Sequence, residues 1–332
     1  MNILIVVNSI IPAKLYGGTQ RVIWSLGKEL SKLGHKVTYL AKKGSKCDFA
    51  NIINIDDDKE IHKQIPNDID VVHFNYEQND LYKLKKPYIV TMHGNLNDKK
   101  KLDYNTVFVS KNHAERYNSK SFVYNGLDWN DYSKPNFKKT KNYYHFLGKA
   151  SWKVKNLKGT IRIIKELKNK KLFVLGGERL SERVLKMGPA YFLSNKVVFK
   201  GMVGGIEKEN NLQISNGLIF PVLWHEPFGL VIIESLFYGC PVYGTPYGSL
   251  PELVNNNVGF LSNKRKDIIE KIKYDSNYDN KLCNEYACDT FNSKKMAEKY
   301  LEKYSSVLNG EKLNSNKPQL KNIQKRKYLS FE

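Results

Sequence analysis

The sequence predicts an α/β protein built from two Rossmann-like, doubly wound domains with parallel sheets. Three observations support this fold class. The chain has 332 residues, which is enough for two medium-sized domains. Short apolar runs alternate with helical patterns, and this arrangement is typical of βαβ units in a parallel sheet. The alternation starts again near residue 143, which indicates a second domain.

The first half opens with residues 2–8 (NILIVVN), an apolar run that suits a strand buried on both faces. A loop with Gly17 and Gly18 follows, and then a helical spacing of apolar residues with Thr19 as N-cap and Gly34 as stop. Further strands are predicted at residues 36–41, 71–74, 88–92, 107–110 and 122–124.

The second half repeats this order, with helices at residues 157–168 and 229–239. Its strands are predicted at residues 143–148, 171–177, 196–201, 217–221 and 241–245. A polar, proline-bearing linker at residues 132–142 separates the two series. The predicted organisation is an N-terminal Rossmann-like domain (1–138), a C-terminal Rossmann-like domain (139–292), a helix that packs back toward the first domain (293–310) and a basic flexible tail (311–332).

The formal net charge of +21 fits a polyanionic partner, which can be nucleic acid, an anionic membrane or a phosphorylated substrate. The alternative is that solubility and a coding bias toward lysine explain much of the excess. Part of the charge lies in the predicted tail. The four cysteines show neither zinc spacing nor a disulfide framework, which fits a reducing cytoplasm. The N-terminus lacks the features of a signal peptide, and no apolar run is long enough to span a bilayer. No motif for specific nucleic-acid recognition is present.

The strongest motif is residues 225–242 (HEPFGLVIIESLFYGCPV). Pro227 and Gly229 place Glu226 on a loop, whereas Glu234 lies in the helix that follows. The N-terminus of that helix presents free N–H groups beside Glu226, and such a site suits a diphosphate. A nearby carboxylate can accept hydrogen bonds from sugar hydroxyls. The alternative is a pair of ordinary surface acids.

The second motif is residues 146–159 (FLGKASWKVKNLKG). Lys149 follows a predicted strand at the sheet edge where open α/β sheets bind ligands, and Lys155 precedes the next helix. Two ammonium groups from one loop can neutralise the growing charge of a leaving diphosphate. The alternative is a solvated basic loop.

Two weaker signals lie in the first half. Gly17 and Gly18 let the backbone approach a phosphate or sugar closely, although a plain turn is the better explanation when the pair is taken without the other motifs. His93 follows a strand and is expected to face the same crevice as Gly17 and Gly18, where it can bind a sugar hydroxyl or a phosphate. A lone histidine is more often structural.

Taken together, these segments resemble the retaining glycosyltransferases of the GT-B fold, the glycosyl transferases group 1 family, of the bacterial surface-polysaccharide type. The resemblance runs in order from Gly17 to about Leu261 and includes YNGLD, HEPFGLVIIES, GCPVYGT and GSLPELV. The fold that it implies is two Rossmann-like domains facing across a cleft, with the first domain (1–138) on the acceptor side and the second (139–292) binding the nucleotide-sugar donor.

The resemblance assigns roles to the matching positions. Glu226 would hold sugar hydroxyls, His93 would contact the donor sugar, and Glu234 would bind the ribose. Lys149 and Lys155 would bind the diphosphate, with Lys149 standing where the family usually has arginine, whose two-pronged geometry lysine lacks. The remaining donor-binding positions would contribute backbone groups: Gly17, Gly18, Phe228, Gly229 and Leu230.

The activity that the resemblance implies is metal-independent, retaining transfer of a hexose from a nucleotide diphosphate, most often UDP. The acceptor would be a glycan or a lipid-linked sugar of surface polysaccharide or lipopolysaccharide synthesis. No metal or other cofactor is expected, and the expected location is the cytoplasm, with peripheral attachment to the inner face of an anionic membrane. Two alternatives stay open: a nucleotide-sugar epimerase of similar fold, and a non-catalytic protein that binds polyanions or membranes.

Overall fold

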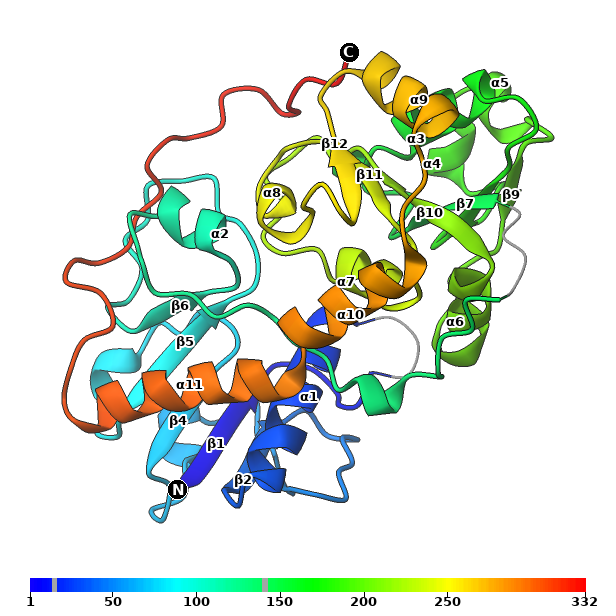
Figure 1. Cartoon of the computed structure of the whole chain (residues 1–332). Coiled ribbons are helices and arrows are strands. Elements are labelled where there is room, and N and C mark those ends of the chain that lie inside the picture. Colours follow the sequence, from blue (N-terminus) through cyan, green and yellow to red (C-terminus); the bar gives the residue numbers. More distant parts are fainter. Residues whose placement is uncertain (14–16, 139–142) are drawn as a thin grey trace. The chain divides into compact units, whose positions relative to one another are not determined.

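The computed structural model describes residues 1–13, 17–138 and 143–332, which fold into two compact units (Figure 1). Unit 1 comprises Met1–Trp129 and Phe291–Gln324, and unit 2 comprises Asn130–Thr290 and Lys325–Glu332. The division falls after Trp129, so the described part of the predicted linker (132–138) belongs to unit 2.

The sheet of unit 1 has six parallel strands in the order β3-β2-β1-β4-β5-β6. Ile3 in β1 pairs with Val37 on one side and Val71 on the other. All three side chains are buried, as expected for a parallel sheet covered on both faces. The strands are β1 (Asn2–Val7), β2 (Lys36–Ala41), β3 (Asn51–Asn54), β4 (Val71–Phe74), β5 (Tyr88–Met92) and β6 (Thr106–Phe108).

Helix α1 (Gly18–Lys32) packs closely on this sheet. Gly27 lets it approach β2, because a Cβ at this position would lie 2.0 Å from the hydroxyl oxygen of Tyr39. The Tyr39 hydroxyl donates to the carbonyl oxygen of Ile23 at 3.1 Å. The unit also contains the helix α2 (Lys111–Arg116) and the 3-10 turns η1 (Ile61–Gln64) and η2 (Leu81–Lys83).

Helix α11 (Ser293–Leu308) begins at the predicted residue, ends two residues before the predicted bound, and packs against α1 and β5. The buried imidazole of His73 anchors it: Nδ1 lies 2.8 Å from the hydroxyl of Tyr304, and Nε2 lies 2.7 Å from Thr91 Oγ1. Thr91 in turn lies 3.0 Å from the hydroxyl of Tyr300. The two tyrosines therefore fix α11 to the sheet by polar contacts inside an apolar layer.

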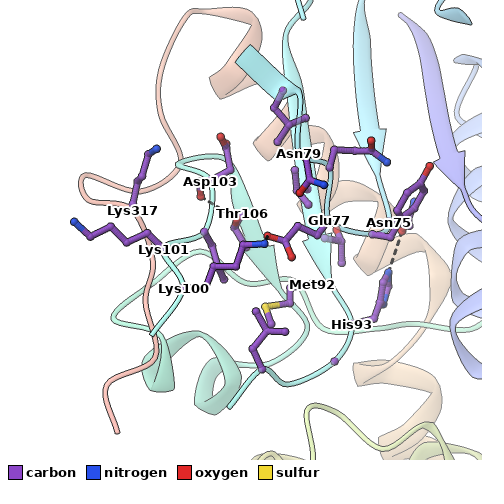
Figure 2. Close-up of a pocket in the computed structure, with 18 of the residues that line it drawn as sticks. Asn75, Glu77, Asn79, Met92, His93, Lys100, Lys101, Asp103, Thr106 and Lys317 are labelled. Atoms are coloured by element: carbon purple, nitrogen blue, oxygen red, sulfur yellow. Dashed lines mark hydrogen bonds and ion pairs between the residues drawn. The ribbon is translucent and has the colours of Figure 1, made fainter. Parts of the chain in front are cut away.

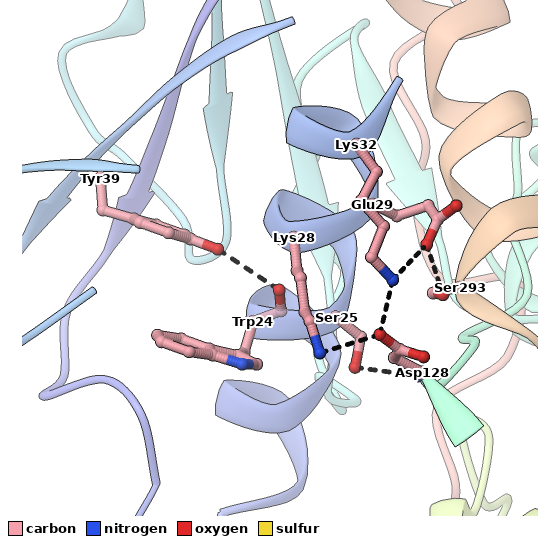
Figure 3. A network of polar contacts seen from close by, with 8 residues as sticks. All are labelled: Trp24, Ser25, Lys28, Glu29, Lys32, Tyr39, Asp128 and Ser293. Carbon is pink, nitrogen blue, oxygen red and sulfur yellow. Dashed lines mark hydrogen bonds and ion pairs between the residues drawn. The ribbon is translucent and has the colours of Figure 1, made fainter. Parts of the chain in front are cut away.

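Asp128, the last residue of the YNGLD motif, ties the end of the first segment of unit 1 to α1 (Figure 3). Its carboxylate lies 3.0 Å from Lys28 Nζ and 2.8 Å from Lys32 Nζ, and its side chain is buried. Glu29 on the same helix accepts a hydrogen bond from the Ser293 hydroxyl at the start of α11. These contacts indicate a structural role for this part of the motif.

The sheet of unit 2 has six parallel strands in the order β12-β11-β10-β7-β8-β9. Buried His145 on β7 links this sheet to a helix: Nδ1 lies 2.6 Å from Ser215 Oγ on β10, and Nε2 lies 2.8 Å from Ser235 Oγ on α7. The strands are β7 (Tyr143–Leu147), β8 (Leu172–Leu175), β9 (Val197–Phe199), β10 (Ser215–Phe220), β11 (Val242–Gly244) and β12 (Gly259–Leu261).

Helices connect these strands and cover the sheet (Figure 1). Their apolar sides pack with the strands into one core, which includes Ile161, Ile164 and Ile268. The helices are α3 (Leu157–Glu166), α4 (Glu182–Leu185), α5 (Pro189–Phe192), α6 (Gly205–Gln213), α7 (Leu230–Phe237), α8 (Leu250–Leu253), α9 (Arg265–Tyr274) and α10 (Asn280–Thr290), with 3-10 turns η3 (Trp129–Asp131) and η4 (Lys153–Lys155).

The two sheets share one strand order, in which the first strand of each unit lies beside the fourth. These neighbours are β1 and β4 in unit 1, and β7 and β10 in unit 2. The order reverses at this pair, so the loops that follow the two strands diverge and leave a crevice at the carboxyl edge of the sheet. This crevice is the expected ligand position in each unit.

Three expectations need correction. The strand predicted at residues 122–124 is only a single bridge between Phe108 and Phe122, whereas strands β3 and β12 went unpredicted. Residues 311–332 do not form a free tail. Leu320 is buried and Asn314 donates to the Thr106 carbonyl oxygen. The segment lacks helical periodicity because it is extended and hydrogen-bonded, not because it is unstructured.

Candidate functional site

The loop after β7 carries both predicted phosphate-binding lysines. Gly148 follows β7 with φ of 148°, and the carbonyl oxygen of this glycine would lie 2.1 Å from a Cβ on Gly176. Lys149 is exposed, and its ammonium lies 6.0 Å from the ring centre of Trp152. Among the residues that the structure describes, Lys149 makes no ion pair. Its charge is therefore available to an anion at the edge of the sheet.

Lys155 contacts Glu226 directly. Its Nζ lies 2.6 Å from Glu226 Oε2, and the side chains are 11% and 7% exposed. The indole N–H of Trp224 donates to the same oxygen at 2.8 Å. The ammonium also lies 5.1 Å and 5.2 Å from the ring centres of Phe220 and Trp224. The two predicted residues thus form one nearly buried ion pair on the loops after β7 and β10, at the switch point.

Asn156 holds Lys155 in this position. It adopts the left-handed backbone conformation (φ 56°, ψ 46°) that asparagine tolerates and caps α3 by accepting from the Gly159 N–H at 2.9 Å. The side-chain amide donates to the carbonyl oxygen of Pro221 at 2.8 Å. One side chain therefore joins the loop after β7 to the loop after β10.

The loop that carries Glu226 is fixed by a tight turn. Ser249 donates its backbone N–H to the Glu226 carbonyl oxygen at 2.9 Å and its hydroxyl to the Phe228 carbonyl oxygen at 2.5 Å. A Cβ on Gly248 would lie 2.2 Å from the backbone nitrogen of Glu226, so only glycine fits there. The GSLPELV segment thereby supports the Glu226 loop.

Helix α7 begins beside this ion pair. Gly229 precedes the helix with φ 92° and ψ 69°, and a Cβ there would lie 3.4 Å from Glu226 Cγ. No side chain caps the first turn of α7, which begins at Leu230. The first turn of a helix carries backbone N–H groups without intrahelical partners and a partial positive charge. This geometry is compatible with an anion site beside Glu226, which stays a prediction.

Glu234 has a partner that the sequence did not reveal. Nζ of Lys208 lies 2.5 Å from Glu234 Oε1, and the side chains are 9% and 1% exposed. The hydroxyl of Tyr132 donates to the same oxygen at 3.2 Å, and its ring centre lies 5.3 Å from the ammonium. Lys208 belongs to α6, in a segment rich in charged and amide residues. Nothing in that pattern distinguishes a buried lysine from an exposed one.

In unit 1, Gly17 and Gly18 lie where β1 leads into α1. Gly18 is the first residue of the helix, and no side chain caps its first turn. A Cβ on Gly17 would lie 2.8 Å from Ala13 Cβ and 2.7 Å from Gln20 Oε1, so the chain is tightly folded there. Residues 14–16 of this loop lie outside the described residues.

His93 follows β5 and contacts Asn75, the residue after β4. Its Nε2 lies 3.0 Å from Asn75 Oδ1. Asn75 donates through Nδ2 to the Val6 carbonyl oxygen at 3.4 Å, so Oδ1 faces the imidazole and Nε2 is the donor. Burial lowers the pKa of His93 to about 4. The imidazole is therefore neutral near pH 7.

A cavity of about 500 Å³ opens beside His93 (Figure 2). It lies at the carboxyl ends of β4 and β5 and is lined by both polar and charged side chains, among them Asn75, Glu77, Lys100 and Lys317. Lys317 comes from the C-terminal segment that the sequence suggested to be a flexible tail. Sequence reasoning identified His93 but missed the rest of this cavity.

The match to a known protein family covers mainly unit 2. Residues 128–286 match the family described as Glycosyl transferases group 1. That segment matches a glycosyltransferase family. An uncharacterized 41.2 kDa protein in the cps region of Klebsiella pneumoniae is 31% identical over 117 residues, which make up 33% of this chain and 32% of that protein. The chain thus matches about a third of the length of this curated relative.

Glycosyltransferases of known structure share the fold of nearly the whole chain. AviGT4, a glycosyltransferase involved in avilamycin A biosynthesis, superposes with a TM-score of 0.75 at 19% identity, over 93% of this chain and 98% of that one. A glycosyltransferase from Rickettsia africae gives 0.74 at 18% identity, over 92% and 98%. HepE from Anabaena, in complex with UDP and glucose, gives 0.67 at 15%, over 92% and 100%. The predicted fold class, an α/β GT-B fold with two Rossmann-like domains, is confirmed.

Two further observations concern the described residues as a whole. None of their helices combines the length and the apolar character that crossing a membrane requires. They also contain no group of three or more His, Cys, Asp or Glu side chains arranged to hold a metal ion.

Proposed function

We propose that the protein transfers a sugar from a nucleotide diphosphate donor to an acceptor. One observation carries this proposal. The nearly buried pair of Lys155 and Glu226 lies beside the uncapped start of α7, at the switch point of the sheet of unit 2. This arrangement combines a cation, a carboxylate and a helix N-terminus, and it lies within the segment that matches the glycosyltransferase family.

The leaving diphosphate would be bound by the loop after β7 and the start of α7. Lys149 and Lys155 supply two positive charges, and the backbone N–H groups of Phe228, Gly229 and Leu230 supply further donors. Charge grows on the diphosphate as its bond to the sugar breaks, so groups already fixed around it stabilise the transition state more than the ground state. Lys155 is fixed by Glu226 and by two aromatic rings before the donor arrives.

The two carboxylates of unit 2 would bind different parts of the donor. Glu226 accepts hydrogen bonds from hydroxyls of the transferred sugar, next to the cation that holds the diphosphate. Glu234 accepts hydrogen bonds from the ribose, and Lys208 is the cation partner of its carboxylate in this buried position. A buried carboxylate without a cation partner would be unstable as an anion.

In unit 1, the backbone N–H groups of Gly17 and Gly18 would donate hydrogen bonds to the donor phosphate, and His93 would contact the donor sugar. The neutral imidazole of His93 can exchange hydrogen bonds with a hydroxyl without adding a charge.

The donor proposed is a UDP-hexose, and the acceptor proposed is a glycan or lipid-linked sugar. Structures of HepE contain UDP, UDP with glucose, or UDP-glucose. The relative in the cps region supports a role in surface polysaccharide or lipopolysaccharide synthesis. We further propose that the transfer retains the anomeric configuration of the sugar and that it needs no metal ion.

A thermal-shift screen against UDP, GDP, ADP and their sugars tests the donor site. A ligand at one hundred times its Kd stabilises the folded state by about 2.7 kcal/mol. One nucleotide should raise the Tm, and the shift should shrink in Glu234→Gln but not in Glu270→Gln, which removes a half-exposed acid from the same unit. A Tm raised only by nucleic acid or anionic vesicles would instead favour the polyanion-binding alternative.

A further inference from the structure

Residues 325–332 leave unit 1 and join unit 2. Gln324 is the last residue of unit 1, where its N–H donates to Asn97 Oδ1 at 2.8 Å and its carbonyl oxygen accepts from Asn97 Nδ2 at 3.3 Å. From Lys325 onward the chain packs on unit 2 and reaches the point where β12 leads into α9 (Figure 1). The segment forms no strand of the unit 2 sheet, yet it is fixed to this unit by several hydrogen bonds.

One of these hydrogen bonds reaches the loop that carries Glu226. The Leu329 N–H donates to the Leu223 carbonyl oxygen at 2.8 Å, and the Leu223 N–H donates to the Val154 carbonyl oxygen at 2.8 Å. Leu223 lies three residues before Glu226, and Val154 immediately precedes Lys155. The backbone of Leu223 therefore connects residue 329 with both loops that supply the Lys155–Glu226 ion pair.

A second contact reaches the turn that supports Glu226. The Tyr247 hydroxyl donates to the Ser330 carbonyl oxygen at 2.8 Å and lies 3.2 Å from Ser330 Oγ. Tyr247 immediately precedes Gly248, where a Cβ would lie 2.2 Å from the backbone nitrogen of Glu226. Residues 329 and 330 thus bond to the Glu226 loop and to the turn packed against it.

Residues 331 and 332 anchor the segment by separate contacts. Phe331 packs against the hydrophobic core of unit 2. The Glu332 N–H donates to the Asn263 carbonyl oxygen at 3.0 Å, and the Glu332 carbonyl oxygen accepts from the Arg265 N–H at the start of α9. Because these contacts are made with the core and with a helix, they hold the neighbouring residues 329 and 330 in place.

We propose that residues 325–332 form a clip that positions Lys155 and Glu226 for the nucleotide-sugar. The inference rests on the proposed function, which assigns these two side chains to the donor. Groups that bind a ligand need supporting contacts that fix their geometry, and the clip supplies such contacts to the backbone of both loops. Leu329 and Tyr247 are therefore positioning residues, and loss of their hydrogen bonds should let the loops shift and weaken donor binding.

Hydrogen–deuterium exchange of the full chain, measured without a donor, tests the contact itself. Leu329→Pro removes the N–H that bonds to Leu223. The amides of residues 222–226 should then exchange about fivefold faster, as expected for the loss of one hydrogen bond. Lys325→Pro is the matched control, because the Lys325 N–H donates to no group in the described part of the chain. Equal exchange of residues 222–226 in the two variants would overturn the clip.

Donor kinetics test what the clip does. Leu329→Pro and Tyr247→Phe, which removes only the hydroxyl that bonds to Ser330, should each raise the KM for the donor about fivefold. Tyr274→Phe is the control, because it removes a hydroxyl from a tyrosine that is 83% exposed, and it should leave the KM unchanged. Partial unfolding would lower the apparent kcat at constant KM, so a raised KM separates positioning from a loss of stability.

Two results would overturn the positioning role alone: an unchanged KM in both Leu329→Pro and Tyr247→Phe, or an equal rise in Tyr274→Phe. A chain that binds and turns over no nucleotide-sugar even when unmodified would instead overturn the proposed function. The two failures are distinguishable, because the first is seen only in the variants and the second already in the unmodified chain.

Discussion

Lys208 Nζ lies 2.5 Å from Glu234 Oε1, and both side chains are almost completely removed from water. Removing one member of a buried ion pair leaves the other charge uncompensated, which typically costs about 3–5 kcal/mol. The carboxylate that the family resemblance assigns to the ribose is therefore also a structural element of unit 2.

Lys208→Met should lower the free energy of unfolding by about 3–5 kcal/mol. Urea denaturation at pH 7 measures this change. Lys266→Met serves as the control, because the pair of Lys266 with Glu270 is exposed and should contribute less than about 1 kcal/mol. Similar losses in the two variants would show that the Lys208 ion pair is not a buried structural contact.

Lys155→Gln should reduce the turnover of donor by about 10²–10³-fold, the usual effect of removing one group that stabilises developing charge. Lys149→Arg should retain activity, because it keeps the charge and adds a bidentate geometry. Steady-state release of the nucleoside diphosphate measures both. An unchanged rate in Lys155→Gln would remove this residue from the proposed mechanism.

Part of this site could be predicted because its chemistry is local in sequence. Lys155 follows a short apolar strand, and Glu226 precedes a proline, a glycine and an apolar helix, so both residues fall at the edge of a parallel sheet. The fold class could be predicted for the same reason, since the runs that form β1 and β7 are mostly apolar.

The rest depended on contacts between segments that are distant in sequence. Lys208 looks like any lysine of a polar helix until the fold places it against Glu234. Leu320 stands nearly alone among lysines, asparagines and glutamines, so nothing in the sequence indicated that it would pack near Phe108 and Tyr117. Strand β3 (Asn51–Asn54) is short and only half-buried, and it resembles a loop.

Leu320→Ala should destabilise the chain by about 2–5 kcal/mol, as expected for a leucine that is fully buried in a cluster with Leu102 and Tyr117. Ile323→Ala is the control from the same segment, because Ile323 is 46% exposed and should change stability by less than about 0.5 kcal/mol. If both substitutions leave the denaturation midpoint unchanged, the C-terminal segment is a free tail after all.

Two buried histidines, His73 and His113, and the partly buried His93 predict loss of stability in mild acid. Burial lowers the pKa of His73 to about 3, that of His93 to about 4 and that of His113 to about 3. In the unfolded chain these histidines have their ordinary pKa of about 6.5 and bind protons below that pH. In the folded chain they stay neutral until the pH approaches 4 or 3. Their stabilising contribution is therefore complete above pH 6.5 and is lost progressively as the pH falls toward 4 and 3.

Urea denaturation at pH 7, 6 and 5 tests this expectation. The free energy of unfolding should fall by up to about 1.4 kcal/mol per pH unit for each histidine. His73→Asn should be less stable at pH 7, because it loses the contacts to Thr91 and Tyr304, but should show a smaller pH dependence. An unchanged slope would mean that His73 takes up its proton equally in both states.

Release of a nucleoside diphosphate from UDP-glucose and related donors tests the central claim most directly. It is measured for the unmodified chain with and without EDTA, and for Glu226→Gln and Glu270→Gln. We expect one donor to be turned over at the same rate with and without EDTA, with a loss of about 10²-fold or more in Glu226→Gln and none in Glu270→Gln. No turnover of any nucleotide-sugar, or turnover that is unaffected by Glu226→Gln, would contradict a donor site at the switch point of unit 2.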